Sequence, residues 1–141
     1  MEVLGREECL RLLATQDFGR LAINLREEVP TVRPVNYFFD GRTESIVFRT
    51  AYGAKFAGIL LARKAVFEID GVDHATRTGW SVIATGPVEK ITNYRELERF
   101  AGEPLDPWAP GDKPYWGRIR VWTVSGRRVA SLDRGDSPSS G

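Results

Sequence analysis

The chain has 141 residues, of which 42% are hydrophobic and 28% are charged, proportions typical of one globular domain with a single core. Its formal net charge of +1 at pH 7 excludes the broad basic field that drives nucleic-acid binding. The apolar runs are of strand length, far below the ~20 residues that span a bilayer, and no signal-peptide pattern opens the sequence, so we expect a cytoplasmic protein without membrane contact.

The first half of the chain predicts one helix and three strands. Leucines at helical spacing follow two glutamates within residues 6–14, which indicates a short amphipathic helix. The next segments are rich in β-branched and aromatic residues between turn residues, a pattern typical of strands. We expect strands over Phe18–Leu25, Thr31–Phe39 and Ser45–Thr50, the last two joined by a turn at Asp40-Gly41-Arg42.

The middle of the chain predicts a helix and two further strands. Apolar residues share one face of a short helix over Gly53–Ala62. Lys64–Asp70 alternates as a half-buried strand, with Val66 and Phe67 on opposite faces. After a polar loop, Trp80–Thr92 is a longer strand in which Gly86-Pro87 requires an edge, a bulge or a bend.

The last third predicts a capped helix, a loop and one more strand. Asn93 is placed to cap a helix that runs to Phe100, with Glu96 at the capping-box position. A proline-rich loop leads to a final strand over Tyr115–Ser125. Residues 126–141 are rich in Arg, Ser, Gly and Asp, which predicts a disordered tail after a single domain over residues 1–125.

Six strands separated by short helices predict a mainly β fold, a Greek-key barrel with peripheral helices. A doubly wound fold is disfavoured because it needs a helix after nearly every strand. Cys9 is the only cysteine, which excludes an internal disulfide, and we expect it to be a small core residue. His74 is the only histidine and lies in a polar loop, so we expect neither a protein metal site nor a catalytic histidine.

One stretch gathers groups suited to binding an anion. The strand that ends in Arg49-Thr50 leads through a glycine-containing turn into a helix with Lys55 in its first turn. Backbone N–H groups at a helix N-terminus point toward an anion, and a lysine beside them adds a full positive charge. These residues predict a phosphate site, although Arg49 and Lys55 also fit a solvated rim.

The order of short motifs resembles the pyridoxamine 5′-phosphate oxidase-like family of flavin-binding split barrels, nearest the branch of nitroimidazole-resistance proteins. The motifs that carry this resemblance are Gly19-Arg20-Leu21-Ala22, Pro34-Val35-Asn36-Tyr37, Phe48-Arg49-Thr50, Lys55, Phe67-Glu68-Ile69-Asp70 and Gly79-Trp80-Ser81-Val82 with Gly86. The resemblance implies a six-stranded split β-barrel, a homodimer, and FMN bound in two clefts at the dimer interface. Some members use a deazaflavin coenzyme instead.

The resemblance also implies cofactor-binding residues. Arg33, Pro34, Val35 and Asn36 match positions along the isoalloxazine ring, and Arg49, Thr50 and Lys55 match the phosphate positions. Trp80 and Ser81 match positions that reach the flavin from the long strand, commonly from the partner subunit. Trp122 resembles a C-terminal aromatic residue of the true oxidases. Read without the family, Trp80 is equally a core residue, Asn36 a brace for a turn, and Pro34 the mark of an edge strand.

The chain departs from the true oxidases at its C-terminus. Their last segment carries an arginine and a histidine that bind the substrate phosphate, whereas this chain ends in Gly126-Arg127-Arg128 and a polar tail without a histidine. Oxidation of vitamin B6 is therefore disfavoured. We expect an FMN-dependent oxidoreductase that transfers a hydride or electrons to a small organic substrate, with no side chain that stands out as a general acid or base. The rival hypotheses are a deazaflavin-dependent reductase, a flavin- or haem-binding module without turnover, and a barrel dimer without cofactor.

Overall fold

The computed structural model describes residues 1–24, 29–50, 64–103 and 115–130. In chain order the elements are β1 (Glu2–Leu4), α1 (Arg6–Leu13), β2 (Phe18–Ile23), β3 (Thr31–Asn36), β4 (Phe38–Asp40), β5 (Ser45–Thr50), β6 (Lys64–Asp73), β7 (Thr78–Lys90), α3 (Tyr94–Ala101), β8 (Tyr115–Arg120) and β9 (Thr123–Val129). The helix expected over Gly53–Ala62 and the tail beyond residue 130 lie outside the described residues.

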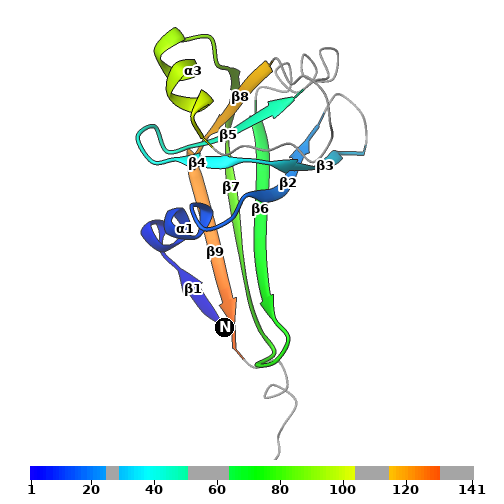
Figure 1. The fold of residues 1–141 in the computed structure, drawn as a ribbon. Coiled ribbons are helices and arrows are strands. Elements are labelled where there is room, and N and C mark those ends of the chain that lie inside the picture. Colours follow the sequence, from blue (N-terminus) through cyan, green and yellow to red (C-terminus); the bar gives the residue numbers. More distant parts are fainter. Residues whose placement is uncertain (25–28, 51–63, 104–114, 131–141) are drawn as a thin grey trace, which may run out of the picture.

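The strands form one antiparallel sheet that curls into a split barrel, which confirms the expected fold class (Figure 1). Hydrogen-bonded neighbours follow the order β3-β2-β6-β7-β8-β5-β4, and β9 adds to β7 and carries β1 on its other edge. β3, the first strand of this order, comes close to β5 near its other end, but no ladder of hydrogen bonds joins these two strands. The barrel is therefore split at the strands that carry the predicted ring and phosphate residues.

The core follows from strict alternation along the strands. In β6, Ala65, Phe67 and Ile69 are buried, while their neighbours point out of the barrel. β2 repeats the pattern, and α1 contributes Cys9 and two leucines to the same core. Cys9 is fully buried, as expected. Because each slip of one residue would turn the apolar set toward water, this alternation fixes the register of the ladder.

The strand predicted over Thr31–Phe39 is interrupted at Tyr37. The Tyr37 backbone N–H donates to the Asp17 carbonyl at 3.0 Å, and its hydroxyl donates to the Leu13 carbonyl at 2.6 Å. These bonds turn Tyr37 into the core, where burial raises the pKa of its hydroxyl. The chain then changes ladder, since β3 pairs with β2 and β4 pairs with β5.

β7 changes partner at Gly86-Pro87, where the sequence predicted a bend. Up to Thr85 it pairs with β9, and from Val88 it pairs with β8. The connection between β8 and β9 crosses close to Gly86: a Cβ atom there would lie 1.6 Å from the Arg120 carbonyl oxygen. Only glycine permits this approach, so Gly86 is where one strand passes from one half of the barrel to the other.

α3 is held over β4, β5 and β8 by buried charges. Asn93 caps it by accepting from the Glu96 N–H at 3.0 Å, as expected, whereas the Glu96 carboxylate pairs with Arg118. Arg118 is only 2% exposed, and its Nε also lies 3.0 Å from Glu89 Oε1, without hydrogen-bond geometry. Arg99 forms two hydrogen bonds to Asp40, at 2.7 and 3.1 Å. Paired in this way, the buried charges fix where α3 docks.

The last strand expected over Tyr115–Ser125 is two strands. β8 ends at Arg120 and β9 continues to Val129, past the expected domain end at residue 125. The break between them is held by Arg6, which donates to the Val121 and Trp122 carbonyls at 3.1 and 3.3 Å. Within the described part of the chain, neither helix has the length and apolar composition to cross a membrane.

Candidate functional site

Three of the predicted cofactor residues lie on one outer face of the sheet. Arg20 of β2 lies directly opposite both Pro34 of β3 and Glu68 of β6. Glu68 lies opposite Ile83 of β7 in turn. Directly opposite residues in a ladder point to the same face, with Cβ atoms about 4.5–5.5 Å apart. Pro34, Arg20, Glu68 and Ile83 therefore form one row across four strands.

The next row on this face carries the two polar residues that were predicted to bind the cofactor, Asn36 and Ser81. Asn36 lies opposite Phe18, and Asp70 lies opposite Ser81, which in turn faces Arg127 of β9. The face thus has Pro34 and Asn36 at one side and Ser81 at the other. Arg20, Glu68 and Asp70 lie between these two sides, and the prediction did not assign them to the site.

Asn36 is tied to the turn before β2. Its Nδ2 donates to the Asp17 carbonyl at 3.4 Å, next to the hydrogen bond from the Tyr37 N–H to the same oxygen. This contact agrees with the alternative reading of Asn36 as a brace. In this bond the Asn36 amide acts as a donor through its nitrogen.

The acidic cluster is built from two carboxylates around one guanidinium. Arg20 Nη1 lies 3.0 Å from Glu68 Oε1 and 3.6 Å from Asp70 Oδ2. Burial raises the pKa of Glu68 to about 7, with a further contribution from the hydrogen bond and negative charge of Asp70, and Arg20 offsets only part of this rise. Groups that titrate near neutral pH are concentrated in functional sites, so this cluster extends the candidate site.

The remaining ring residues point to the other side of the sheet. Arg33 lies opposite the buried Leu21, and Val35 packs against the core. Both therefore contribute to a ligand on the outer face through their backbone at most. Val35 is a core residue by its contacts.

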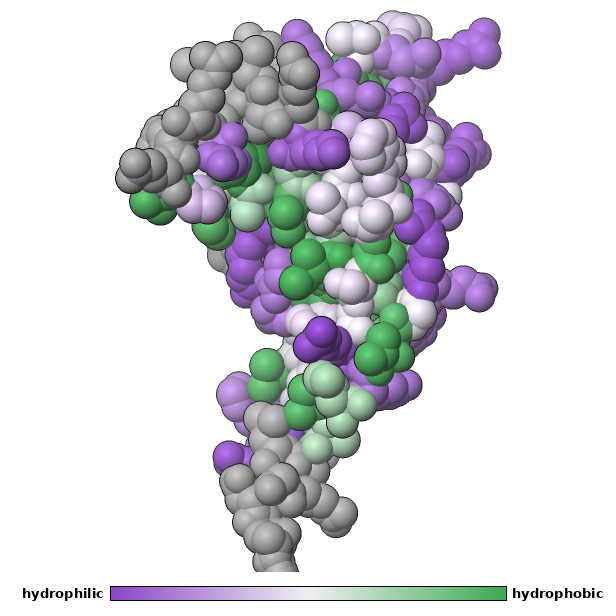
Figure 2. All heavy atoms as spheres, turned by 180° about the vertical axis from the view of Figure 1, so that it is seen from behind, coloured by the Kyte–Doolittle hydropathy of each residue, from purple (hydrophilic) through white to green (hydrophobic). Residues whose placement is uncertain are grey.

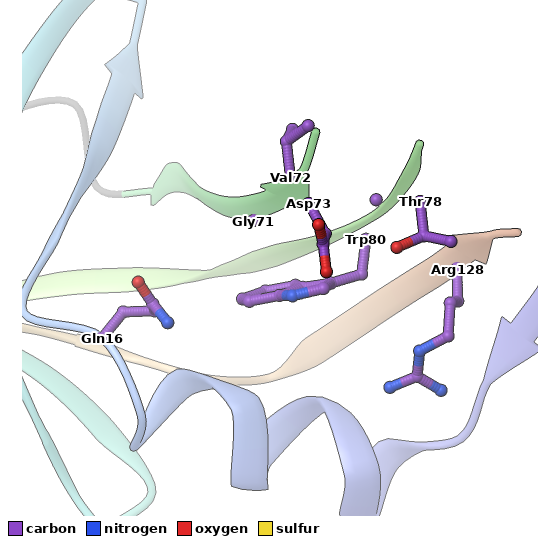
Figure 3. Close-up of a pocket in the computed structure, with 8 residues that line it drawn as sticks. Gln16, Gly71, Val72, Asp73, Thr78, Trp80 and Arg128 are labelled. Carbon is purple, nitrogen blue, oxygen red and sulfur yellow. The ribbon is translucent and has the colours of Figure 1, made fainter. Parts of the chain in front are cut away.

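Trp80 lies at the far end of the β6–β7 hairpin, on the inner side. It lies opposite Gly71 and lines a pocket of about 240 Å³ together with Gln16, Val72, Asp73, Thr78 and Arg128 (Figure 3). The Arg128 guanidinium turns toward α1, away from the indole, because Glu2 and Glu8 each bind it at 3.2 Å. Within one chain, Trp80 therefore points away from the outer face, and β2 and β6 lie between its strand and β3 in the order of the sheet (Figure 1).

The predicted phosphate residues are described only in part. The Arg49 guanidinium stacks on Trp116 at 4.9 Å from the ring centroid, on the side of β5 opposite the buried Phe48. The Thr50 backbone pairs with Tyr115 at the end of β5, and its side chain lies outside the described set. Lys55 also lies outside the described residues. The geometry of the phosphate site therefore remains a prediction.

The outer face also carries exposed apolar side chains. Val32 is 62% exposed and Ile83 is 43% exposed, with Val66 beside them, and Trp122 is exposed at the end of the face, where Lys64 lies 5.6 Å from its ring centroid. Seen from behind, the molecule has apolar side chains gathered in the middle of its surface with polar ones around them (Figure 2). A cluster of this kind on a globular domain indicates an interaction surface or a ligand site.

Comparison with known proteins points in the same direction. The family model of pyridoxamine 5′-phosphate oxidase matches residues 5–128. The uncharacterized protein Rv0080 of Mycobacterium tuberculosis is 36% identical over 141 residues, covering 93% of this chain and 87% of the relative. A solved structure from Corynebacterium glutamicum, named after the same oxidase, superimposes with a TM-score of 0.79 at 27% identity, covering 92% of this chain and 98% of the other.

The FAD binding protein of Mycobacterium smegmatis is also similar, with a TM-score of 0.73 and 28% identity over 90% of this chain and 98% of the other. The match of the family model over most of the chain, on the split barrel described above, shows that this chain belongs to the pyridoxamine 5′-phosphate oxidase family.

Proposed function

We propose that this chain is an FMN-binding oxidoreductase that transfers a hydride or electrons through the flavin to a small organic substrate. The observation that carries the proposal is the outer sheet face, on which Pro34, Asn36 and Ser81 flank one apolar and acidic surface. A flavin ring requires an apolar surface with a few polar groups at its edge, and this face provides both. The similarity to a protein named for FAD binding supports a flavin over other cofactors.

We further propose that the protein works as a homodimer whose interface is built from barrel strands and includes the Trp80 region. The exposed apolar residues of the outer face support this arrangement, because aromatic and aliphatic side chains are enriched in the buried part of such interfaces. In a dimer each site can take Trp80 from the partner chain, whereas Trp80 of the same chain points to the inner side of the sheet, away from the face that carries Pro34 and Asn36. An obligate interface of this kind buries well over ~2,000 Å² in total.

In this proposal the phosphate is held by Arg49, Thr50 and Lys55, and the ring by the backbone of residues 33–36 with Asn36, Ser81 and Trp80. When bound, the flavin supplies the redox chemistry, while the protein positions the substrate and sets the reduction potential through donors near the ring. The side chains of the face then exclude water and hold or release protons.

The test is the absorption spectrum of the purified protein, followed by titration with FMN, FAD and a deazaflavin coenzyme. Binding of FMN with a flavin spectrum supports the proposal, whereas a haem Soret band or a deazaflavin spectrum supports the rival cofactors. Turnover with a reduced nicotinamide and an electron acceptor separates an enzyme from a binding module. Light scattering at micromolar concentration tests the dimer, and a monomer there contradicts it.

A further inference from the structure

The cluster of Arg20, Glu68 and Asp70 occupies the middle of the face on which the flavin is proposed to bind, so a role for this cluster in the reaction rests on the proposed function. Glu68 is in the row of Pro34 and Ile83, and Asp70 is opposite Ser81. The Glu68 side chain is 28% exposed, so it is shielded from water but reachable from the surface. A ligand that spans Asn36 and Ser81 on this face passes over both carboxyl groups.

The charges around Glu68 come from three strands. β2 contributes Arg20, at 3.0 Å; β6 contributes Asp70, two residues along on the same face, and Lys64, which lies at the ring of Trp122. β9 contributes Arg127, beyond Ser81 on the side of Asp70. The residues of β7 and β3 on this face that neighbour the cluster are uncharged: Ser81, Ile83, Thr85, Val32, Pro34 and Asn36.

Two carboxylates that share one guanidinium nitrogen repel each other, and the shielding of Glu68 strengthens that repulsion. The pair therefore retains one proton to a higher pH than an isolated carboxyl group does, and the pKa of Glu68 is about 7. A proton donor works best when its pKa lies near the working pH, because it is then both loaded and able to release the proton.

We propose that Glu68, paired with Asp70 and positioned by Arg20, donates the proton that accompanies hydride transfer to the substrate. The substrate class that this role implies is a molecule with a polar double bond, such as a quinone or a conjugated carbonyl compound. Bound flavin, reduced by a reduced nicotinamide or by dithionite, would supply the hydride, which forms one new bond on the conjugated system of the substrate and leaves the flavin oxidised. The Glu68 O–H bond breaks, its proton forms a new O–H bond at the substrate oxygen to give the hydroquinone or enol, and solvent returns a proton to the Glu68 carboxylate.

The first test does not depend on activity. Carbon-13 NMR of the flavin-free protein follows the carboxyl groups through a pH titration, with Glu68→Gln used to assign the signal. We expect Glu68 to titrate near neutral pH in the wild type and at clearly lower pH in Asp70→Asn, because that variant removes the neighbouring negative charge. A Glu68 signal that titrates near its ordinary pKa of 4.5 in the wild type overturns the proposal.

The second test uses the FMN-loaded protein reduced with dithionite and mixed with menadione in a stopped-flow instrument. We expect the rate constant of flavin reoxidation to fall as the pH rises through 7 in the wild type. In Glu68→Gln it should be lower by on the order of 10²-fold at about pH 6 and lose this pH dependence. Glu98→Gln removes an exposed carboxylate on α3, away from the face, and serves as the matched control with wild-type rates.

The outcomes separate the two proposals. If FMN binds and Glu68→Gln keeps the wild-type rate and pH profile while its circular dichroism is unchanged, the proton-donor assignment is wrong and the flavin proposal stands. If neither FMN nor another flavin binds, the proposed function is wrong and the donor assignment is overturned with it. An NMR titration near neutral pH together with loss of the pH profile in Glu68→Gln supports both.

Discussion

The indole of Trp80 covers the backbone of Gly71, the residue directly opposite it in the β6–β7 ladder. A Cβ atom on Gly71 would lie 2.6 Å from Trp80 Nε1 and 2.8 Å from Cε2. Gly71 is therefore what allows the ring to lie against the hairpin and line the pocket.

Gly71→Ala should displace this indole. Because overpacking forces side chains from their preferred rotamers, we expect a loss of about 1–3 kcal/mol in the free energy of unfolding and a changed near-ultraviolet circular dichroism spectrum. Gly41→Ala is the matched control, since a Cβ atom there meets nothing within 4 Å. Equal urea midpoints and spectra for the two variants would show that Trp80 does not depend on Gly71.

The Glu68 carboxyl group should make stability fall with rising pH. Its pKa is about 7 in the folded protein, above its ordinary value of 4.5, so the folded state binds more protons than the unfolded state between these values. The stabilisation is fully present below pH 4.5 and is lost as the pH rises through 7. We therefore expect the urea midpoint of the wild type to decrease from about pH 5 to about pH 8 more than that of Glu68→Gln. Parallel midpoint curves would contradict this.

Asp40 should act in the opposite direction. Hydrogen bonds from Arg99 and Thr43 outweigh burial and hold the pKa of Asp40 at about 2, below its ordinary 3.8. Its contribution of about 2–3 kcal/mol is present above about pH 4 and is lost as the pH falls through about 2. Asp40→Asn should lose a similar amount at neutral pH in chemical unfolding, whereas Asp17→Asn, at an exposed position, should change little. A loss below about 0.5 kcal/mol, on the order seen for exposed ion pairs, would refute the argument.

The phosphate site can be tested by charge. Lys55→Ala and Arg49→Ala should each weaken FMN binding by roughly 1.5–3 kcal/mol, the range for a hydrogen bond to a charged group. Arg49 also stacks on Trp116, so its loss affects packing as well. Arg49→Lys keeps the charge and loses the planar stacking, which separates the two roles. Wild-type FMN affinity in both alanine variants would place the phosphate elsewhere.

Asn36→Leu tests contact with the flavin ring. The variant should bind FMN through an intact phosphate site and lose about 1 kcal/mol for one hydrogen bond, with a shifted flavin spectrum and midpoint potential. Because Asn36 also donates to the Asp17 carbonyl, Asn36→Asp, which keeps an acceptor at this position and removes the donor, is the comparison. An unchanged spectrum and potential in Asn36→Leu would leave only the bracing role.

The type of most elements could be predicted from the sequence, because β2, β6 and β7 alternate and β5 is a short run of β-branched and aromatic residues after a turn. The two strand breaks, at Tyr37 and after Arg120, could not be predicted in this way. Tyr37 has high strand propensity, and what turns it inward is a pair of bonds to residues 13 and 17. The break after Arg120 depends on Arg6, which is distant in the sequence and donates to the Val121 carbonyl. Distant contacts override local propensity at both points.

The candidate site shows the same limit. Alternation predicts that Glu68 and Asp70 point outward, and both residues are in the motif on which the family resemblance depends. Their role depends on the register of the strands. The register places Arg20 between Pro34 and Glu68, and it places Asp70 opposite Ser81. Register across four strands is set by the assembled core and the turns, and a single sequence does not specify it.

The change of partner in β7 at Gly86 has a consequence for how the molecule opens. One continuous strand supplies hydrogen bonds to β6 and β9 in one half of the barrel and to β8 in the other. If β7 separates from β6 and β9, β8 also loses its hydrogen-bonded neighbour, and if β7 separates from β8, β6 and β9 lose theirs. The two halves should therefore open as one cooperative unit, with backbone amides of β6 and β8 exchanging with deuterium at the same free energy.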